Sequence, residues 1–158
     1  MIHHPQTTIH AARLGNLEIL KELIRLEADL NASDEKGYTA LIIACYNRQY
    51  PAAQLLIENG AAVNSQDHGG NTALMGASFK GYHNVVELLI RNGADLNIQH
   101  GNGGTALMFA AMFGRNDIVS LLLEHGADRT LLDSRGLTAI DLAAQQGNVE
   151  AIKLLTAP

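Results

Sequence analysis

Apolar residues recur with helical spacing in short segments that end at glycines. In residues 85–90 they stand at i, i+3 and i+4, which predicts an amphipathic helix, and Gly93 suits the left-handed position that ends many helices. Residues 72–80 predict a preceding helix, with Thr72 where an N-cap belongs and Gly81 just past its end. Residues 94–103 are rich in Asn, Asp and Gly and predict an extended turn. One such unit is too small to bury its own apolar face.

The same pattern returns every 33 residues along almost the whole chain. The motif Thr-Ala-Leu at Thr39 returns at Thr72 and Thr105, and as Thr-Ala-Ile at Thr138. Other residues keep the same spacing, in the columns Ala11, Ala44, Ala77, Ala110, Ala143; Gly37, Gly70, Gly103, Gly136; Gly60, Gly93, Gly126; and Asn31, Asn64, Asn97. This periodicity predicts a stacked-repeat architecture, in which neighbouring copies bury the faces that a single copy leaves exposed.

The repeat resembles the ankyrin repeat, whose 33-residue unit is a β-turn followed by two antiparallel helices. The segment TALMFAAMFGRNDIVSLLLEHGAD at residues 105–128 carries the resemblance, together with its counterparts one and two periods upstream. The resemblance covers roughly residues 6–158. It implies an all-α solenoid of about five units that forms one elongated domain over residues 1–158, with units at about 5–37, 38–70, 71–103, 104–136 and 137–158.

The sequence departs from the family pattern at several positions. Alanine follows each Thr where the family usually has Pro, and no His stands two residues further on, so we expect modest stability in the same fold. Glu27 occupies a glycine column, which implies either a different turn or a strained one. Arg48 breaks a second glycine column, Pro51 follows at a plausible first helical position, and together they predict a reshaped loop between the two helices.

Composition excludes several classes of partner. The net charge is −5, and the 11 Lys and Arg are scattered among 16 acidic residues without a basic run, which argues against nucleic acid and anionic membrane surfaces. Cys45 is the single cysteine, so no internal disulfide forms. Residues 1–10 are polar and no apolar run would span a bilayer, so we expect a cytoplasmic protein. A signal peptide removed ahead of this sequence is compatible with the same residues.

The candidate binding residues follow from the resemblance, because first helices and turn tips form the concave face that usually binds partners in ankyrin-like proteins. Four of the seven aromatic residues fall in columns on that face. Aromatic anchors are enriched in interfaces, and the alternative is that the rings merely cover neighbouring repeats. The predicted partner-binding residues are Arg13, Tyr38, Tyr46, Asn47, Asn71, Phe79, Lys80, Asn102, Met112, Phe113 and Arg135. The turn tips carry charges of both signs, which favours a partner without strong charge.

Other chemistry is poorly supported by the residues. Of the seven histidines, His3 and His4 are adjacent near the N-terminus and the other five stand in different phases of the repeat. No pair has the i, i+4 spacing of a metal site on one helix, so no metal is expected. Cys45 is expected to be a buried, inert thiol, and Asp141 a helix-capping residue. The tip 100–104 is rich in glycine and should be mobile, but it lacks the Lys-Ser/Thr ending of a phosphate-binding loop.

These observations predict a monomeric, non-catalytic adaptor or inhibitor that binds another protein through the concave face and needs no cofactor. We could not assemble a convergent set of acid, base and nucleophile. The alternative is a structural element that associates with copies of itself through the aromatic patch. Fold alone does not identify the partner.

Overall fold

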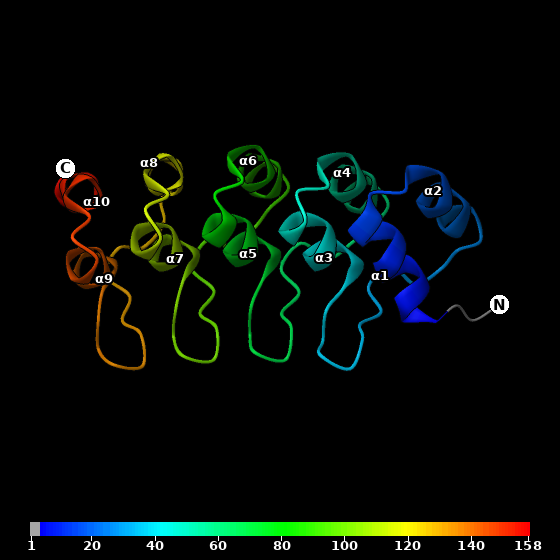
Figure 1. Cartoon of the computed structure of the whole chain (residues 1–158), viewed down its shortest axis with the longest axis horizontal. Helices are drawn as coiled ribbons and strands as arrows, with labels where there is room; N and C mark the ends of the chain where they lie inside the picture. The colour runs from blue at the N-terminus through cyan, green and yellow to red at the C-terminus, as the bar shows by residue number, and fades with distance from the viewer. Residues whose placement is uncertain (1–3) are drawn as a thin grey trace.

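The computed structural model describes residues 4–158, and its helices form consecutive antiparallel pairs along one elongated stack (Figure 1). The first helices of the pairs form one row, the second helices form another, and the turn loops project on the opposite side of the first row (Figure 1). The all-α solenoid prediction is confirmed. The ten helices within the described residues are α1 (Pro5–Leu14), α2 (Leu17–Arg25), α3 (Ala40–Tyr46), α4 (Tyr50–Glu58), α5 (Ala73–Lys80), α6 (His83–Arg91), α7 (Ala106–Met112), α8 (Asn116–Glu124), α9 (Ala139–Gln145) and α10 (Val149–Thr156).

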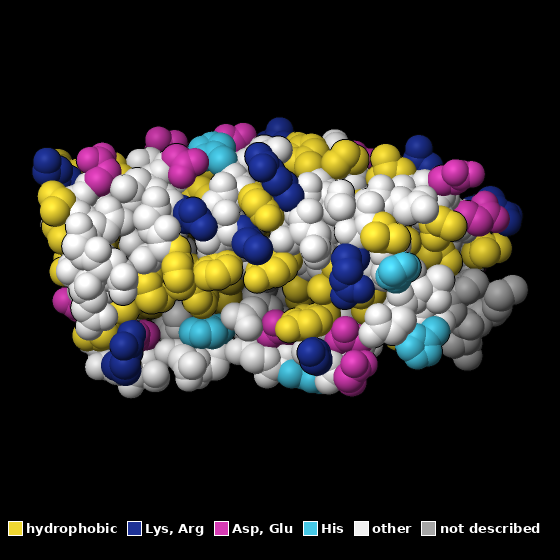
Figure 2. Space-filling model, in the orientation of Figure 1, with side chains coloured by type: hydrophobic (Ala, Val, Ile, Leu, Met, Phe, Trp, Pro, Cys, Tyr) yellow, Lys and Arg dark blue, Asp and Glu magenta, His cyan; other side chains and the backbone are white. Residues whose placement is uncertain are grey.

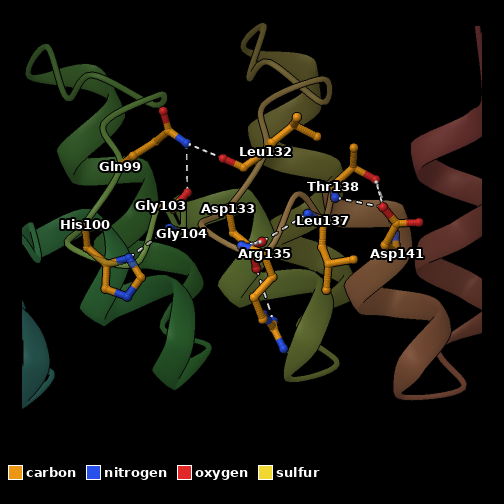
Figure 3. Close-up of polar contacts among 10 residues, drawn as sticks. All are labelled: Gln99, His100, Gly103, Gly104, Leu132, Asp133, Arg135, Leu137, Thr138 and Asp141. Carbon is orange, nitrogen blue, oxygen red and sulfur yellow. Dashed lines mark hydrogen bonds and ion pairs between the residues drawn. The ribbon is translucent and has the colours of Figure 1, made fainter.

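The threonine column marks the start of four first helices. The Oγ1 atoms of Thr39, Thr72 and Thr105 each accept a hydrogen bond at 3.2 Å from the backbone N–H three residues later. At Thr138 the bond is reciprocal, because its backbone N–H donates to Asp141 at 2.9 Å and completes a capping box (Figure 3). The capping role predicted for Asp141 is confirmed. N-capping of this kind stabilises a helix by about 1 kcal/mol without the histidine of the family pattern.

The asparagine column joins each repeat to the next. Asn31 donates from Nδ2 to the carbonyl of Gly60 at 3.2 Å, and its Oδ1 accepts from the N–H of Ala62 at 2.7 Å. Asn64 and Asn97 each accept the equivalent bond from the following repeat at 2.8 Å. These bonds satisfy backbone groups in the turn that follows each second helix and tie it to the same turn of the preceding repeat.

The core lies between the two rows of helices. Alanines on the first helices have no exposed surface, which lets the helices approach closely; they are Ala44, Ala77, Ala110 and Ala143. A leucine column on the second helices is at most 6% exposed and comprises Leu23, Leu56, Leu89, Leu122 and Leu155. Burying one such side chain contributes roughly 1.5–3 kcal/mol, so the leucine column is a major source of stability.

Glu27 occupies the glycine column without changing the turn. Its φ is 59°, in the same left-handed region as Gly60 at 99° and Gly93 at 89°. The N–H of Ala28 bonds to the carbonyl of Leu23 at 3.0 Å, as in the later repeats. Of the two alternatives for this turn, the structure therefore shows the strained one, which costs roughly 1 kcal/mol for a residue with a Cβ.

The loop at Arg48 is not reshaped, so that prediction is wrong. Arg48 has a φ of 56°, close to the 68° of Gly15 and the 82° of Gly81 at the equivalent positions. The next repeat accommodates the Arg48 side chain, because the guanidinium lies over the Tyr82 ring, 5.3 Å from the ring centroid. Behind Gly81, by contrast, a Cβ would meet the Arg115 side chain at 3.0 Å. Proline 51 is the second residue of α4 rather than the first.

Candidate functional site

Three aromatic rings line up across consecutive repeats at the C-terminal ends of first helices. The rings of Tyr46 and Phe79 are stacked, with centroids 6.5 Å apart and an interplanar angle of 2°. Phe79 and Phe113 meet edge to face, with centroids 4.7 Å apart. Tyr46 is 43% exposed and Phe113 is 44% exposed, with the half-buried Phe79 between them. We call these three residues the aromatic track. Figure 2 shows hydrophobic side chains gathered in a band along the row of first helices.

The repeat spacing alone does not place Phe113 in this track. The residue 33 positions after Phe79 is Met112, the last residue of α7, and it is half-buried. Phe113 follows as the C-cap of α7, where its N–H bonds to the carbonyl of Phe109 at 3.1 Å. The contact with Phe79 is therefore made by the residue that ends the helix.

A hollow of about 490 Å³ lies next to the aromatic track. Six predicted binding residues, which lie from α1 to α5, line it: Arg13, Tyr38, Tyr46, Asn47, Asn71 and Phe79. The remaining lining residues, which the sequence analysis did not select, are Ile42, Ile43, Asp67, Thr72, Met75, Gly76 and Phe109. We call this cavity the Gly76 hollow. Its walls are mostly apolar, and amide and charged groups lie at its rim.

Gly76 gives the hollow its space. It stands in the middle of α5, in a column whose other members are His10, Ile43, Phe109 and Leu142. A Cβ at Gly76 would lie 3.3 Å from Cδ1 of Tyr46, so even a methyl group would press on the ring. A glycine inside a helix costs about 1 kcal/mol relative to alanine. Gly76 does not need a left-handed backbone, so what it provides is open space on the face.

A second hollow of about 400 Å³ lies toward the C-terminal repeats. Three predicted residues line it: Asn102, Met112 and Arg135. Phe109 lines both hollows and stands between them. Lys80 and Phe113 line neither, but the Lys80 ammonium lies 4.8 Å from the centroid of the Tyr46 ring. The structure thus gathers all eleven predicted residues around the track and the two hollows, which together we call the first-helix face.

Two of the residues that were not predicted, Gly76 and Phe109, matter most for the shape of this face. Phe109 lies one helical turn before Phe113, and its position is not in any of the columns from which binding residues were predicted. Gly76 could have been found from the sequence, because it is a glycine inside a predicted helix, in a column whose other members have large side chains. Both residues shape the hollows rather than extend the track.

The turn loops that border this face are held by a side chain at one repeated position. Asp133 Oδ1 accepts from the backbone N–H of Leu137 at 3.0 Å and of Arg135 at 2.9 Å (Figure 3). These bonds, chiefly that from Leu137, hold the pKa of Asp133 below its ordinary value. Asp67 and Asp34, two and three repeats upstream of Asp133, make the same pair of bonds.

His100 takes the place of the aspartate in the glycine-rich loop. Its Nδ1 accepts from the N–H of Gly104 at 2.8 Å (Figure 3). Its ring lies edge to face with the Phe109 ring, with centroids 5.2 Å apart. The tip is also bonded to both neighbouring loops, from Gly101 to the carbonyl of Gly69 and from Ser134 to the carbonyl of Asn102, each at 2.9 Å. The loop predicted to be mobile is therefore tied on both sides.

In the part of the chain that the structure describes, the single cysteine is buried and the potential metal ligands do not cluster. Cys45 has no exposed surface, so the burial predicted for it is confirmed, and this burial raises the pKa of its thiol to about 12. Within residues 4–158 the His, Cys, Asp and Glu side chains form no group of three or more that could hold a metal ion. His3 lies outside the described residues.

None of the helices in residues 4–158 combines the length and apolar character that a membrane span requires.

Comparison with protein families gives a match that spans most of the chain. The family model described as ankyrin repeats (3 copies) matches residues 8–100 and again residues 74–158. The two matches overlap and together leave out few residues.

Individual relatives match shorter segments. Human protein phosphatase 1 regulatory subunit 27 is 43% identical over 61 residues, which cover 37% of this chain and 40% of the relative. The putative ankyrin repeat protein YahD of Escherichia coli is 35% identical over 57 residues, covering 36% of this chain and 28% of the relative. The palmitoyltransferase akr1 of Schizosaccharomyces pombe is 48% identical over 52 residues, covering 32% of this chain and 8% of the relative. The matched segments thus cover less than half of each relative.

Proposed function

The chain belongs to the ankyrin-repeat family, and from this premise we propose that it is a non-catalytic module that holds a partner protein on its first-helix face. Ankyrin repeats are protein–protein interaction modules. The relative from human is by its name a regulatory subunit of a phosphatase, which supports an adaptor or inhibitor role. The thiol of Cys45 is buried and protonated, so it is not available as a nucleophile on the face.

One observation carries the proposal: the aromatic track is partly exposed beside an open hollow. Tyr46 and Phe113 keep more than 40% of their surface exposed, although the Phe79 ring is stacked with Tyr46 and meets Phe113 edge to face. Stability alone would be served better by burying such rings. Aromatic side chains beside a pocket are the usual anchors of protein interfaces. Truncating one such anchor to alanine can cost about 2 kcal/mol or more of binding free energy.

The test is affinity capture from a lysate of the source cells, followed by mass spectrometry. The variant Tyr46→Ala/Phe79→Ala/Phe113→Ala removes the track, and we expect it to lose a partner that the wild-type protein captures. The control variant Ile19→Ala/Val149→Ala removes two exposed apolar side chains from the second helices, which are 45% and 59% exposed. It should capture the partner as the wild type does.

Circular dichroism shows whether each variant keeps its helices. A folded track variant that captures the same proteins as the wild type would overturn the proposal. If the only protein lost is the chain itself, the face joins copies of this chain, and the self-association alternative replaces the adaptor role.

A further inference from the structure

Charge is distributed unevenly around the first-helix face. The two helices of each pair are connected through residues 13–16, 46–49, 79–82, 112–115 and 145–148. These five segments contain four basic residues and no Asp or Glu, in a chain whose net charge is −5. We call the four residues the basic edge: Arg13, Arg48, Lys80 and Arg115. Figure 2 shows Lys and Arg side chains along the border of the hydrophobic band that faces the second helices.

The basic edge is not neutralised within the described part of the chain. None of its four side chains takes part in the ion pairs found in residues 4–158, which involve Glu22, His83 and Asp133 with their partners. Arg48 lies over the Tyr82 ring and Lys80 over the Tyr46 ring, contacts that leave their charges uncompensated. Arg115 donates from Nε to the carbonyl of Phe79 at 3.0 Å, which leaves the other guanidinium nitrogens for a ligand.

The opposite border of the face has a different character. The turn loops there carry Lys36 and Arg135 together with Asp34, Glu35, Asp67 and Asp133, so both signs are present and acidic residues are in excess. The carboxylate of Asp67 accepts bonds from Gly69 and Asn71 in its own loop. A ligand on the face therefore meets an excess of positive charge on one side only. The charges of both signs at the turn tips, which favoured a partner without strong charge, describe only the other border.

We infer that the partner presents an acidic peptide segment with one bulky apolar side chain. The inference rests on the proposed function and names its ligand. The apolar side chain enters the Gly76 hollow and packs against Tyr46 and Phe79, while carboxylates of the same segment lie along the basic edge. The hollow, at about 490 Å³, is many times the roughly 30 Å³ of one water molecule and has room for a large side chain.

The two halves of this site contribute differently. Burial of the apolar side chain supplies most of the affinity, because the hollow is lined by aromatic and aliphatic groups. The exposed cations steer acidic segments toward the face and discriminate against basic ones, and salt weakens this contribution. Binding should therefore weaken as the ionic strength rises.

The experiment selects peptides from a display library of short random sequences on the immobilised wild-type chain. We expect the selected peptides to have a net negative charge and to share a large apolar or aromatic residue. Two variants test the two halves of the site. Gly76→Leu fills the hollow and should abolish binding of these peptides, and Arg13→Gln/Lys80→Gln should weaken it about tenfold and reduce its salt dependence.

The matched control is Lys21→Gln/Lys153→Gln, which removes two exposed charges from the second helices. It should bind the peptides as the wild type does. Selected peptides that lose binding to the track variant but are neutral or basic would overturn the inference and leave the proposed function standing. Peptides that bind the track variant as well as the wild type would overturn both. A selection that enriches no peptide overturns the acidic segment alone, since a folded partner still fits the proposed function.

Discussion

A Cβ atom on Gly76 would lie 3.3 Å from Cδ1 of Tyr46, so the glycine inside α5 and the ring at the end of α3 share the space of one hollow. Tyr46 is partly exposed and its ring can move outward, whereas the α5 backbone is packed between α3 and α7. The hollow therefore depends on the missing side chain of Gly76.

Gly76→Ala should stabilise the fold. Alanine is favoured over glycine inside a helix by about 1 kcal/mol, and the exposed ring of Tyr46 can relieve the close contact. We expect urea denaturation to show a free energy of unfolding higher by roughly 0.5–1 kcal/mol. The matched control is Gly114→Ala, where φ is 73° and nothing lies within 4 Å of the added Cβ. It should lower stability by about 1 kcal/mol, and equal effects at both sites would contradict this account.

Ser78→Ala should also raise stability. The Ser78 hydroxyl is fully buried and has no hydrogen-bond partner within the described residues. Leaving a buried polar group unpaired costs roughly 1–3 kcal/mol, and alanine occupies the equivalent positions 12, 111 and 144. Thermal or urea unfolding should show a gain of about 1 kcal/mol, while the exposed Ser134→Ala changes stability by less than about 0.5 kcal/mol. A loss of stability in Ser78→Ala would show that the hydroxyl is satisfied.

Replacing the two non-glycine residues that have a left-handed backbone, Glu27 and Arg48, by glycine should distinguish the cost of backbone strain from the gain of side-chain packing. Glu27→Gly removes a strained backbone position, since φ there is 59°, and should stabilise the fold by about 1 kcal/mol. Arg48→Gly relieves the same strain but loses the contact with the Tyr82 ring, which contributes about 0.5–1 kcal/mol, so its net effect should be close to zero. Denaturation of both variants measures the difference. A larger gain from Arg48→Gly would contradict the role given to Tyr82.

The buried thiol of Cys45 should make the free energy of unfolding fall at alkaline pH. Burial raises its pKa from 9.0 to about 12, so the folded state keeps the thiol proton that the unfolded state releases above pH 9. The neutral thiol thus favours folding fully below pH 9, and this contribution falls as the pH rises from 9 toward 12. Comparing the unfolding of wild type and Cys45→Ala isolates the effect, because other groups titrate equally in both. A stability difference that stays constant between pH 8 and about pH 11 would contradict the prediction.

The fold could be predicted from the sequence, because the repeat records it several times over. The threonine and asparagine columns correspond to helix caps and to bonds between repeats, so their spacing carried structural information. The prediction for the loop at Arg48 was wrong because it considered only the repeat in which Arg48 replaces glycine. The residue that accommodates the Arg48 side chain is Tyr82, in the following repeat.

The candidate face was predicted only in part. Single positions such as Tyr46 and Phe79 follow from the repeat, but a hollow depends on which side chains are missing between neighbours. Phe113 joins the track from a helix cap that lies outside its aromatic column. The basic edge is likewise invisible along the chain, because its four residues are far apart in sequence and are brought together by stacking.

The central claim is that a partner occupies the first-helix face, and site-specific photo-crosslinking tests it most directly. A benzoylphenylalanine placed at Phe113 reports on the face, and one at Ile19 reports on α2; the native side chains are 44% and 45% exposed. Irradiation in lysate followed by mass spectrometry should give a covalent adduct with one partner protein from position 113 and none with that protein from position 19. An adduct formed equally from both positions, or only from position 19, would contradict the assignment of the face.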